Sequence, residues 1–263
     1  MIRTIIPSKD RAAQLDLLLR SMKRFFENWG DQTAIVLFRT TTDEYRSGYD
    51  TLQREHPEFV YVEEEDFRRD VKKIALAGEE GYLQFLVDDD VYVRPWSLGD
   101  SQFSDFSGDT DIAALSLRMS PAMDYCFTEN VRTGTPWFRL DGAWFWPGLK
   151  GDWGYPHSVD GTIWRRCDVR AVIAHGKYDM LHQLEPALRG GMTRPLAICY
   201  GESRLLNVAD NSTQDGVVAN RHGGGDPEVM NRRYLAGERI QMDNIIAARP
   251  NSPHFLIEYE WAS

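Results

Sequence analysis

Three consecutive carboxylates, Asp88, Asp89 and Asp90, directly follow the apolar segment Leu83–Val87. Like charges that are crowded together repel one another, so we expect a partner that offsets their charge. A divalent cation such as Mg²⁺ or Mn²⁺ would do so, and it can keep coordination positions open for the oxygens of a diphosphate. In open α/β sheets ligands lie beyond the carboxyl ends of strands, where these residues fall. This placement favours a cation site over the alternative, a solvated acidic turn.

Alternating strands and helices are expected to position these carboxylates. In the first half of the chain, short apolar segments alternate with amphipathic stretches, which is typical of a mostly parallel sheet wound with helices. Apolar residues repeat at three- and four-residue spacing from Leu15 to Phe26, which predicts a buried helix face. Further helices are predicted to end near His56 and to span Asp66–Ala77. The predicted strands are Arg3–Pro7, Ala34–Phe38, Phe59–Val62 and Leu83–Val87.

The second half has a different pattern. Residues 125–164 are rich in tryptophan, glycine and proline and predict a loop-rich region, and the glycine-rich stretch 210–226 is expected to be mobile. No internal repeat or linker is evident, so we expect one domain over 1–263, with halves of about 1–100 and about 101–263. The remaining predicted elements are strands over Ile112–Leu117, Ser158–Arg165 and Phe255–Trp261, and a helix over Tyr178–Leu188.

Composition excludes several classes of protein. A chain of 263 residues with 42% hydrophobic content suits a globular domain and is not typical of a disordered chain. With 30 Lys+Arg against 40 Asp+Glu, the net charge of −10 argues against a nucleic-acid binder. No apolar run approaches the ~20 residues of a membrane span, and charges interrupt the opening segment where a signal peptide would be apolar. We therefore predict a cytoplasmic protein and leave peripheral membrane association open. Three widely spaced cysteines indicate neither a disulfide framework nor a CxxC metal site.

The first hundred or so residues resemble a known family. The segment IPSKDR after the first strand, Thr41-Thr42-Asp43 after the second and FLVDDDVYV after the fourth occur in the order and spacing of GT-A glycosyltransferases of the family 2 type. The resemblance implies an α/β fold of GT-A type, a Rossmann-like mixed sheet flanked by helices, in which the first half binds the nucleotide and the second half the acceptor.

The resemblance also implies residue roles on the donor side. Asp88 falls at the ribose-side position, Asp90 at the metal position, and Asp89 lies between them in the same nucleotide-sugar site. The residues at base-side positions are Pro7, Ser8, Lys9, Arg11 and Asp43. The basic residues Arg68, Arg69 and Lys72 match a region that often approaches the donor, and the alternative for each is a solvated helix face.

Acceptor-side roles follow the same resemblance. Asp160, in a segment that ends in Arg165-Arg166, resembles the strand that floors the acceptor site, although an Asp-Gly turn is the alternative. Glu185 stands where the family carries an acidic ED-type motif, but the second acidic residue is missing. An acceptor hydroxyl is a poor nucleophile and needs a general base, for which Glu185 is the first candidate and Asp160 the second. Otherwise Glu185 would be a first-turn residue of a helix that starts near Pro186.

Two further groups complete the expected site. GT-A enzymes commonly add a late histidine to the metal ligands; His254 is our candidate and His222 its competitor. Flat aromatic rings pack against sugars, so one or two tryptophans are expected to line an acceptor pocket. The candidates are Trp144, Trp146 and Trp153.

These features predict a metal-dependent transferase that moves a hexose-like sugar from a nucleotide diphosphate sugar to a hydroxyl acceptor, in glycan or polysaccharide synthesis. The family 2 resemblance favours inversion at the anomeric carbon, and the base is left open between uridine and guanosine. One alternative is a sugar-phosphate nucleotidyltransferase, although PSKDRAAQL lacks the glycines usual after the first strand of that class. A haloacid-dehalogenase-like phosphatase would carry its DxD after the first strand. A calcium-dependent carbohydrate-binding protein is expected to be all-β.

Overall fold

The computed structural model describes residues 1–211, 213 and 221–263. Much of the stretch 210–226, predicted to be mobile, lies outside the described residues. Within the described ranges, none of the helices has the length and apolar content needed to cross a bilayer.

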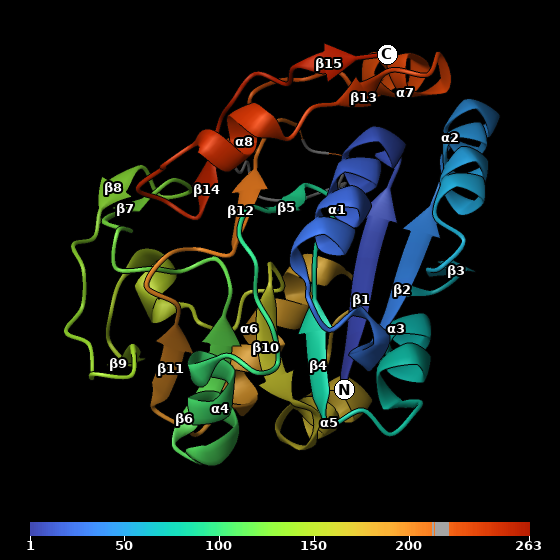
Figure 1. The fold of residues 1–263 in the computed structure, drawn as a ribbon. Coiled ribbons are helices and arrows are strands. Elements are labelled where there is room, and N and C mark those ends of the chain that lie inside the picture. Colours follow the sequence, from blue (N-terminus) through green and yellow to red (C-terminus); the bar gives the residue numbers. More distant parts are fainter. Residues whose placement is uncertain (212, 214–220) are drawn as a thin grey trace.

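The first half of the chain builds one side of a mixed sheet by alternating strands with helices (Figure 1). Its strands run parallel to one another, as the sequence predicts. They are β1 (Ile2–Lys9), β2 (Gln32–Arg39), β3 (Val60–Glu63) and β4 (Tyr82–Phe85). The helices are α1 (Ala12–Phe25), α2 (Asp43–Glu55) and α3 (Phe67–Leu76), and the apolar face of α1 is buried as expected.

The second half completes the same sheet, whose strand order is β3-β2-β1-β4-β10-β6-β11-β9. β10 is antiparallel to both of its neighbours, β4 and β6, which makes the sheet mixed. The added strands are β6 (Ile112–Ser116), β9 (Ala143–Phe145), β10 (Thr162–Arg165) and β11 (Leu196–Cys199). The helices around them are α4 (Ser101–Gly108), α5 (Arg166–His175) and α6 (Leu181–Gly191).

Two apolar cores lie on the two faces of this sheet, because successive side chains of a strand point to opposite faces. Ile2 and Ile6 of β1 join the core that contains α1, whereas Ile5 joins the core that contains α3, α5 and α6. The side chains of all three isoleucines are buried. The sheet is therefore covered on both faces, and the expected mixed sheet flanked by helices is confirmed.

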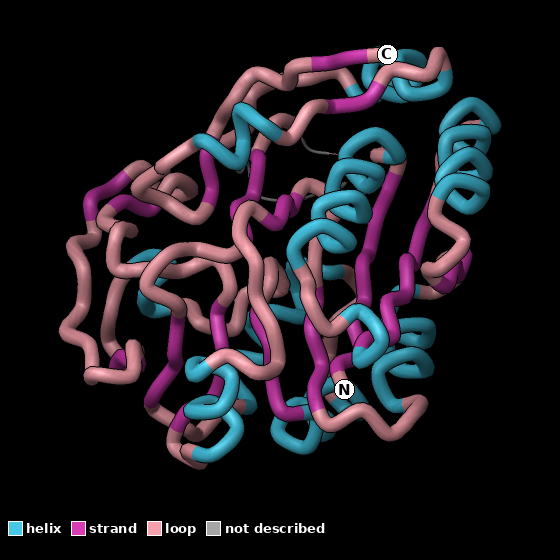
Figure 2. Tube along the Cα trace, viewed as in Figure 1, coloured by secondary structure: helices cyan, strands magenta, loops and turns pink. Residues whose placement is uncertain are grey.

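A smaller sheet lies beside the first, in the order β14-β12-β5. Its strands are β5 (Asp90–Tyr92), β12 (Leu205–Val208) and β14 (His254–Phe255). Other short elements are β7 (Tyr125–Cys126), β8 (Val131–Arg132), β13 (Arg239–Ile240), β15 (Trp261–Ala262), α7 (Pro227–Leu235), α8 (Asp243–Ala247) and the 3-10 turns Trp29–Asp31 and Gly151–Gly154. Figure 2 shows that most of the chain between β6 and β10 is loop, as predicted.

Several predicted boundaries are wrong. The strand expected from Ser158 begins only at Thr162, because Gly161 adopts a positive φ of 69° and ends a turn. The segment expected as one late strand is interrupted: His254–Phe255 pairs with β12, and Trp261–Ala262 pairs with β13. The α5, β11, β12 and α7 segments are not among the predicted elements.

Candidate functional site

A cavity of about 670 Å³ opens where β1, β4 and β6 end and β10 begins. Parallel strands end at the same edge of a sheet, and the antiparallel β10 starts at that edge. Residues that follow β4 therefore meet residues that precede β10. This arrangement brings Asp88 and Asp89 into one cavity with Asp160, although Asp160 lies 71 positions after Asp89 in the chain.

Asp88 is held by the last residues of β1 and by Arg11, which follows the strand. Its carboxylate accepts hydrogen bonds from Ser8 Oγ (2.8 Å) and from the backbone N–H of Lys9 (3.3 Å), and it pairs with the guanidinium of Arg11 (2.8 Å). All four residues line the cavity, together with Pro7. The first loop and the acidic turn therefore form one wall, as the sequence predicts for a shared ligand site.

Asp89 and Asp90 diverge from this arrangement. Asp89 lines the cavity and accepts from Arg11 (3.0 Å) and from Asn207 Nδ2 (2.8 Å). Asp90 is fully buried and is not among the lining residues; its oxygens accept from the Val87 N–H (3.0 Å) and from Asn207 (3.2 Å). Asp88 and Asp89 form a turn, after which Asp90 begins β5 and points inward.

The carboxylates at this edge carry more negative charge than their partners balance. Burial, and then the charges of Asp88 and Asp160, raise the pKa of Asp89 to about 6 against the lowering effect of Arg11. Burial, followed by the charges of Asp160 and Asp89, raises the pKa of Asp90 well above its usual range. Crowded buried carboxylates of this kind favour a proton or a cation between them.

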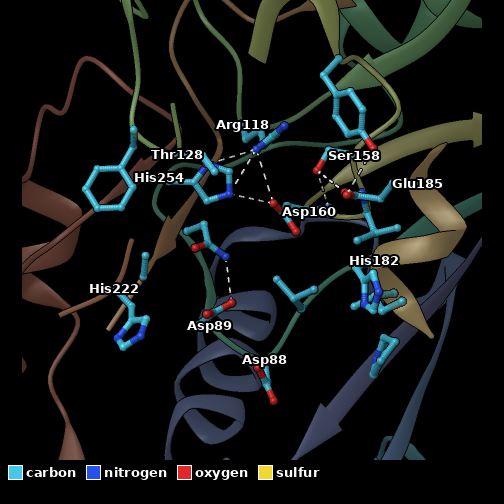
Figure 3. Close-up of a pocket in the computed structure, with 18 of the residues that line it drawn as sticks. Asp88, Asp89, Arg118, Thr128, Ser158, Asp160, His182, Glu185, His222 and His254 are labelled. Atoms are coloured by element: carbon cyan, nitrogen blue, oxygen red, sulfur yellow. Dashed lines mark hydrogen bonds and ion pairs between the residues drawn. The ribbon is translucent and has the colours of Figure 1, made fainter. Parts of the chain in front are cut away.

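The register of the small sheet brings a late histidine to the same place. Asn207 of β12 is paired with Asp90 of β5 on one side and with His254 of β14 on the other, so the three residues form one row. His254 Nε2 lies 2.9 Å from Asp160 Oδ2. Burial lowers the pKa of His254, but the hydrogen bond to Asp160 and the charges of Asp160 and Asp152 together outweigh it, so the net shift is upward. Figure 3 shows His254 beside Asp160, whereas His222 lines the cavity apart from this cluster.

Arg118 is a site residue that the sequence analysis missed. It follows β6 at the same edge, is 2% exposed, and lines the cavity. Its guanidinium lies 3.4 Å from Asp160 and 3.4 Å from Asp152, and 3.4 Å from the ring of His254. Burial raises the pKa of Asp160, but His254 and Arg118 outweigh it and hold it below its usual range. The signal was available, because Arg118 follows a buried strand as Asp88 does.

Glu185 lines the cavity from α6, on a different wall from Asp88 and Arg11. Its Oε1 accepts from the backbone N–H of Val159 (2.8 Å) and from Ser158 Oγ (3.0 Å), and the hydroxyl of Tyr155 lies 3.4 Å from Oε2. Burial, and then the charge of Asp160, raise the pKa of Glu185 to about 7. Because α6 begins at Leu181, Glu185 is not a residue of a helix start at Pro186, and that alternative is wrong. Both acceptor-side candidates face the same cavity (Figure 3).

Two predicted donor-side residues lie elsewhere. Asp43 is the exposed first residue of α2, and Lys72 is exposed on α3; neither is among the residues that line the cavity. Arg69, on the same helix as Lys72, pairs with Glu65 (2.9 Å) and Asp70 (2.9 Å). On α3, therefore, Lys72 faces solvent and Arg69 is held in ion pairs.

The three candidate tryptophans do not line this cavity, so that prediction is wrong here. Trp144 and Trp153 are buried in the core, and the indole N–H of Trp144 donates to the carbonyl of Trp153 (3.0 Å). The indole N–H of Trp146 donates to the carbonyl of Arg194 (3.0 Å). An indole ring with its single N–H donor can pack in the core against a backbone carbonyl as well as it can pack against a sugar. The sequence alone does not distinguish these two environments. The aromatic residues that line the cavity are Phe67, Phe127 and Tyr155.

Similarity to known proteins is partial. No family model matches the chain. Over 196 residues, 65% of the chain, it is 25% identical to the bifunctional glycosyltransferase pgtA of Dictyostelium discoideum, and it spans 25% of the length of that relative. A mannosyltransferase from Pyrobaculum calidifontis, solved with GDP-Man and Mn²⁺, covers 48% of this chain and 41% of its own, with 11% identity and a TM-score of 0.34. S. aureus TarS 1-349 in complex with UDP-GlcNAc covers 78% of this chain and 57% of its own, with 12% identity and a TM-score of 0.50. The fold is that of the GT-A glycosyltransferases.

The GT-A fold confirms the expected fold class. Its mixed sheet also contradicts the all-β architecture expected of a calcium-dependent carbohydrate-binding protein. In this fold the end of β1, the acidic turn, Asp160 and Glu185 all line one cavity.

A divalent cation fits the donor set of the cavity. Asp89, Asp160, Asn207 and His254 all line it and offer oxygen or imidazole nitrogen atoms, which magnesium and manganese accept as ligands. The raised pKa values of Asp89 and Asp90 indicate negative charge that a cation would offset. These residues could hold the ion after His254 and Asn207 adjust their present hydrogen bonds.

Among the described residues, the tightest group of metal-type side chains lies outside the cavity, where Asp16, Glu55 and His56 hold their ligand atoms within 4.8 Å of one another. Asp16 is paired with Arg20 (2.7 Å), and Glu55 with Arg239. The charge of this group is already balanced, so it does not favour a metal.

Proposed function

We propose that this chain is a metal-dependent glycosyltransferase that moves a sugar from a nucleoside diphosphate sugar to a hydroxyl acceptor. The observation that supports the proposal most is the shared cavity, in which Asp88 and Asp89 face Asp160 and Glu185. The GT-A fold and the partial identity to a named glycosyltransferase agree with it. We propose one functional unit, whose first half binds the nucleotide and whose second half binds the acceptor.

In this proposal the end of β1, Arg11 and the acidic turn hold the donor. Asp88, positioned by Ser8 and Arg11, lies where it can accept hydrogen bonds from a ribose. Asp89, with Asn207 and His254, would hold a divalent cation, and Asp90 would add its charge from beneath. A cation held by these residues would supply positive charge for a departing diphosphate. Arg11 and Lys9 supply further positive charge on the same wall.

On the acceptor side, Glu185 is proposed as the general base. Its carboxylate is fixed by Val159 and Ser158 and has a pKa near 7, so it is ready to take a proton from a hydroxyl near neutral pH. Asp160 is kept ionised by Arg118 and His254, and its charge keeps Glu185 basic. A base that faces the sugar from the acceptor side is the arrangement needed for direct displacement with inversion.

The proposal extends to glycan or polysaccharide synthesis as the setting, and a cytoplasmic location stays a prediction. The decisive experiment is a screen of UDP- and GDP-sugars with Mn²⁺, in which release of nucleoside diphosphate is measured with and without candidate acceptors. We expect slow hydrolysis of one donor by the wild type. The variant Asp88→Asn should lose it, whereas Asp141→Asn, which changes a loop residue outside the cavity, should retain it.

The screen also has an outcome that contradicts the proposal. If no nucleotide sugar is hydrolysed or transferred, and calorimetry with Mn²⁺ detects no binding of UDP or GDP, the chain is not a nucleotide-sugar transferase.

A further inference from the structure

One end of the cavity lies beyond β1, β2 and β3, the three parallel strands farthest from the acceptor-side carboxylates in the sheet order. Pro7, Arg39 and Glu64 line this end, one from each strand or its following residue, and Phe67 lines it from the first turn of α3. Phe67 is 8% exposed, so it presents a small, mostly sheltered aromatic surface to the cavity. The end is therefore part apolar and part charged, which suits a flat heterocycle with polar edges.

Glu64 is held in this position by the strand pairing. Its backbone N–H donates to the carbonyl of Phe38 (2.7 Å), which extends the contact between β3 and β2 by one residue. The side chain is half-buried. Burial raises the pKa of Glu64, while the charges of Arg39 and Lys9 act in the opposite direction, so two cations lie near this carboxylate.

The other carboxylates at the ends of β1, β2 and β3 are not available to a ligand at this end of the cavity. Asp10 accepts from both the backbone N–H and the hydroxyl of Thr41, each at 2.8 Å. Asp43 is exposed and does not line the cavity. Glu63, the neighbour of Glu64, pairs with Arg46 (2.6 Å) and also lies outside the cavity. Glu64 is thus the carboxylate that these three strands present to the cavity.

We propose that Glu64 selects the base of the donor nucleotide by accepting a hydrogen bond from a ring N–H. This inference rests on the proposed function. An ionised carboxylate only accepts hydrogen bonds. Uracil and guanine carry a ring N–H on their pairing edge, whereas cytosine and adenine carry a ring nitrogen that accepts. Glu64 therefore favours UDP or GDP and disfavours CDP and ADP.

The test is calorimetric titration of UDP, GDP, CDP and ADP, at constant Mn²⁺, into the wild type and Glu64→Ala. A hydrogen bond to a charged group corresponds to roughly a tenfold change in affinity or more. We expect the wild type to bind UDP or GDP about tenfold more tightly than CDP, and Glu64→Ala to lose this ratio. The ratio is the readout, because removing a negative charge strengthens binding of every diphosphate. Glu63→Gln is the matched control and should keep the ratio.

The isosteric variant Glu64→Gln keeps the side chain's size and distinguishes the two bases. A glutamine amide can accept from the N–H of uracil and donate to the adjacent carbonyl, so UDP binding should change by only a few fold. Guanine presents two adjacent donors, so GDP binding should fall roughly tenfold. Thermal unfolding of each variant shows that it is folded.

Three outcomes decide the matter. Loss of the ratio in Glu64→Ala supports the inference. A wild type that prefers CDP or ADP, or a Glu64→Ala variant that keeps the wild-type ratio, overturns it and leaves the proposed function standing. A wild type that binds no nucleoside diphosphate overturns the proposed function, and the inference with it.

Discussion

Replacing Glu185 by glutamine should separate catalysis from stability. Glutamine keeps the size of the side chain, and its oxygen can still accept from the Val159 N–H and the Ser158 hydroxyl. It cannot take a proton from an acceptor hydroxyl. Turnover should therefore fall roughly 10²-fold or more, while donor affinity stays near that of the wild type.

The same change should stabilise the folded protein above neutral pH. The pKa of Glu185 rises from an ordinary value near 4.5 to about 7, chiefly because burial disfavours the charge. Since one pKa unit corresponds to about 1.4 kcal/mol, the ionised carboxylate lowers the free energy of unfolding by about 3 kcal/mol. The folded state binds the extra proton between these two pKa values, so this loss of stability is absent below about pH 4.5 and complete above about pH 7.

Urea unfolding of both proteins from pH 4 to pH 8 measures this difference. Glu185→Gln should match the wild type at the acidic end and exceed it by up to about 3 kcal/mol at pH 8. Turnover of the wild type should rise with pH through about 7. In Asp160→Asn the loss of a neighbouring negative charge should move that rise to lower pH.

Two results would refute the reasoning. A variant that is active but no more stable at pH 8 means that Glu185 carries no strained charge and is not the base. If Asp160→Asn instead loses turnover while Glu185→Gln keeps it, the two roles are exchanged.

Other perturbations test the donor side. Asp90→Asn should remove a buried acidic group, so the free energy of unfolding without metal should hold or rise. Calorimetry with Mn²⁺ should show weaker nucleoside diphosphate binding, and unchanged binding would contradict the role of Asp90 as a charge beneath the cation. Arg11→Met should leave Asp88 and Asp89 without their buried guanidinium and lower the free energy of unfolding in urea by about 3 kcal/mol, which Mn²⁺ should partly restore. Asp43→Ala should change UDP and GDP affinity less than twofold in the same titrations, because the side chain is exposed outside the cavity; a larger loss would return it to the base site.

The sequence alone determined the alternating first half of the fold and one wall of the site. Its signals are local: period-3.6 apolar residues mark α1, and a short apolar run marks β4. Ser8, Arg11 and Asp88 could be assigned to one edge because each follows a strand of the predicted parallel sheet. That inference needs only the rule that parallel strands end on the same side.

The tertiary structure decided which acidic side chain faces the ligand and what surrounds it. Whether Asp89 or Asp90 points into the cavity depends on the turn after β4 and on the pairing of β5 with β12, neither of which has a local signature. The pairing of strands distant in sequence likewise brings Asn207 and His254 into one row, and the antiparallel insertion of β10 brings Asp160 to Asp89.

Register explains this limit. Shifting a strand by one residue exchanges the faces of all its side chains, and it is the packing of the whole sheet that selects one register. The burial of Arg118 among acidic partners and the placing of Glu64 beyond β3 follow from that same packing. Residues such as Ser8, Arg11 and Asp88 were therefore readable from the chain, but the remaining members of the site, and all of the distances and directions, come from long-range strand pairing.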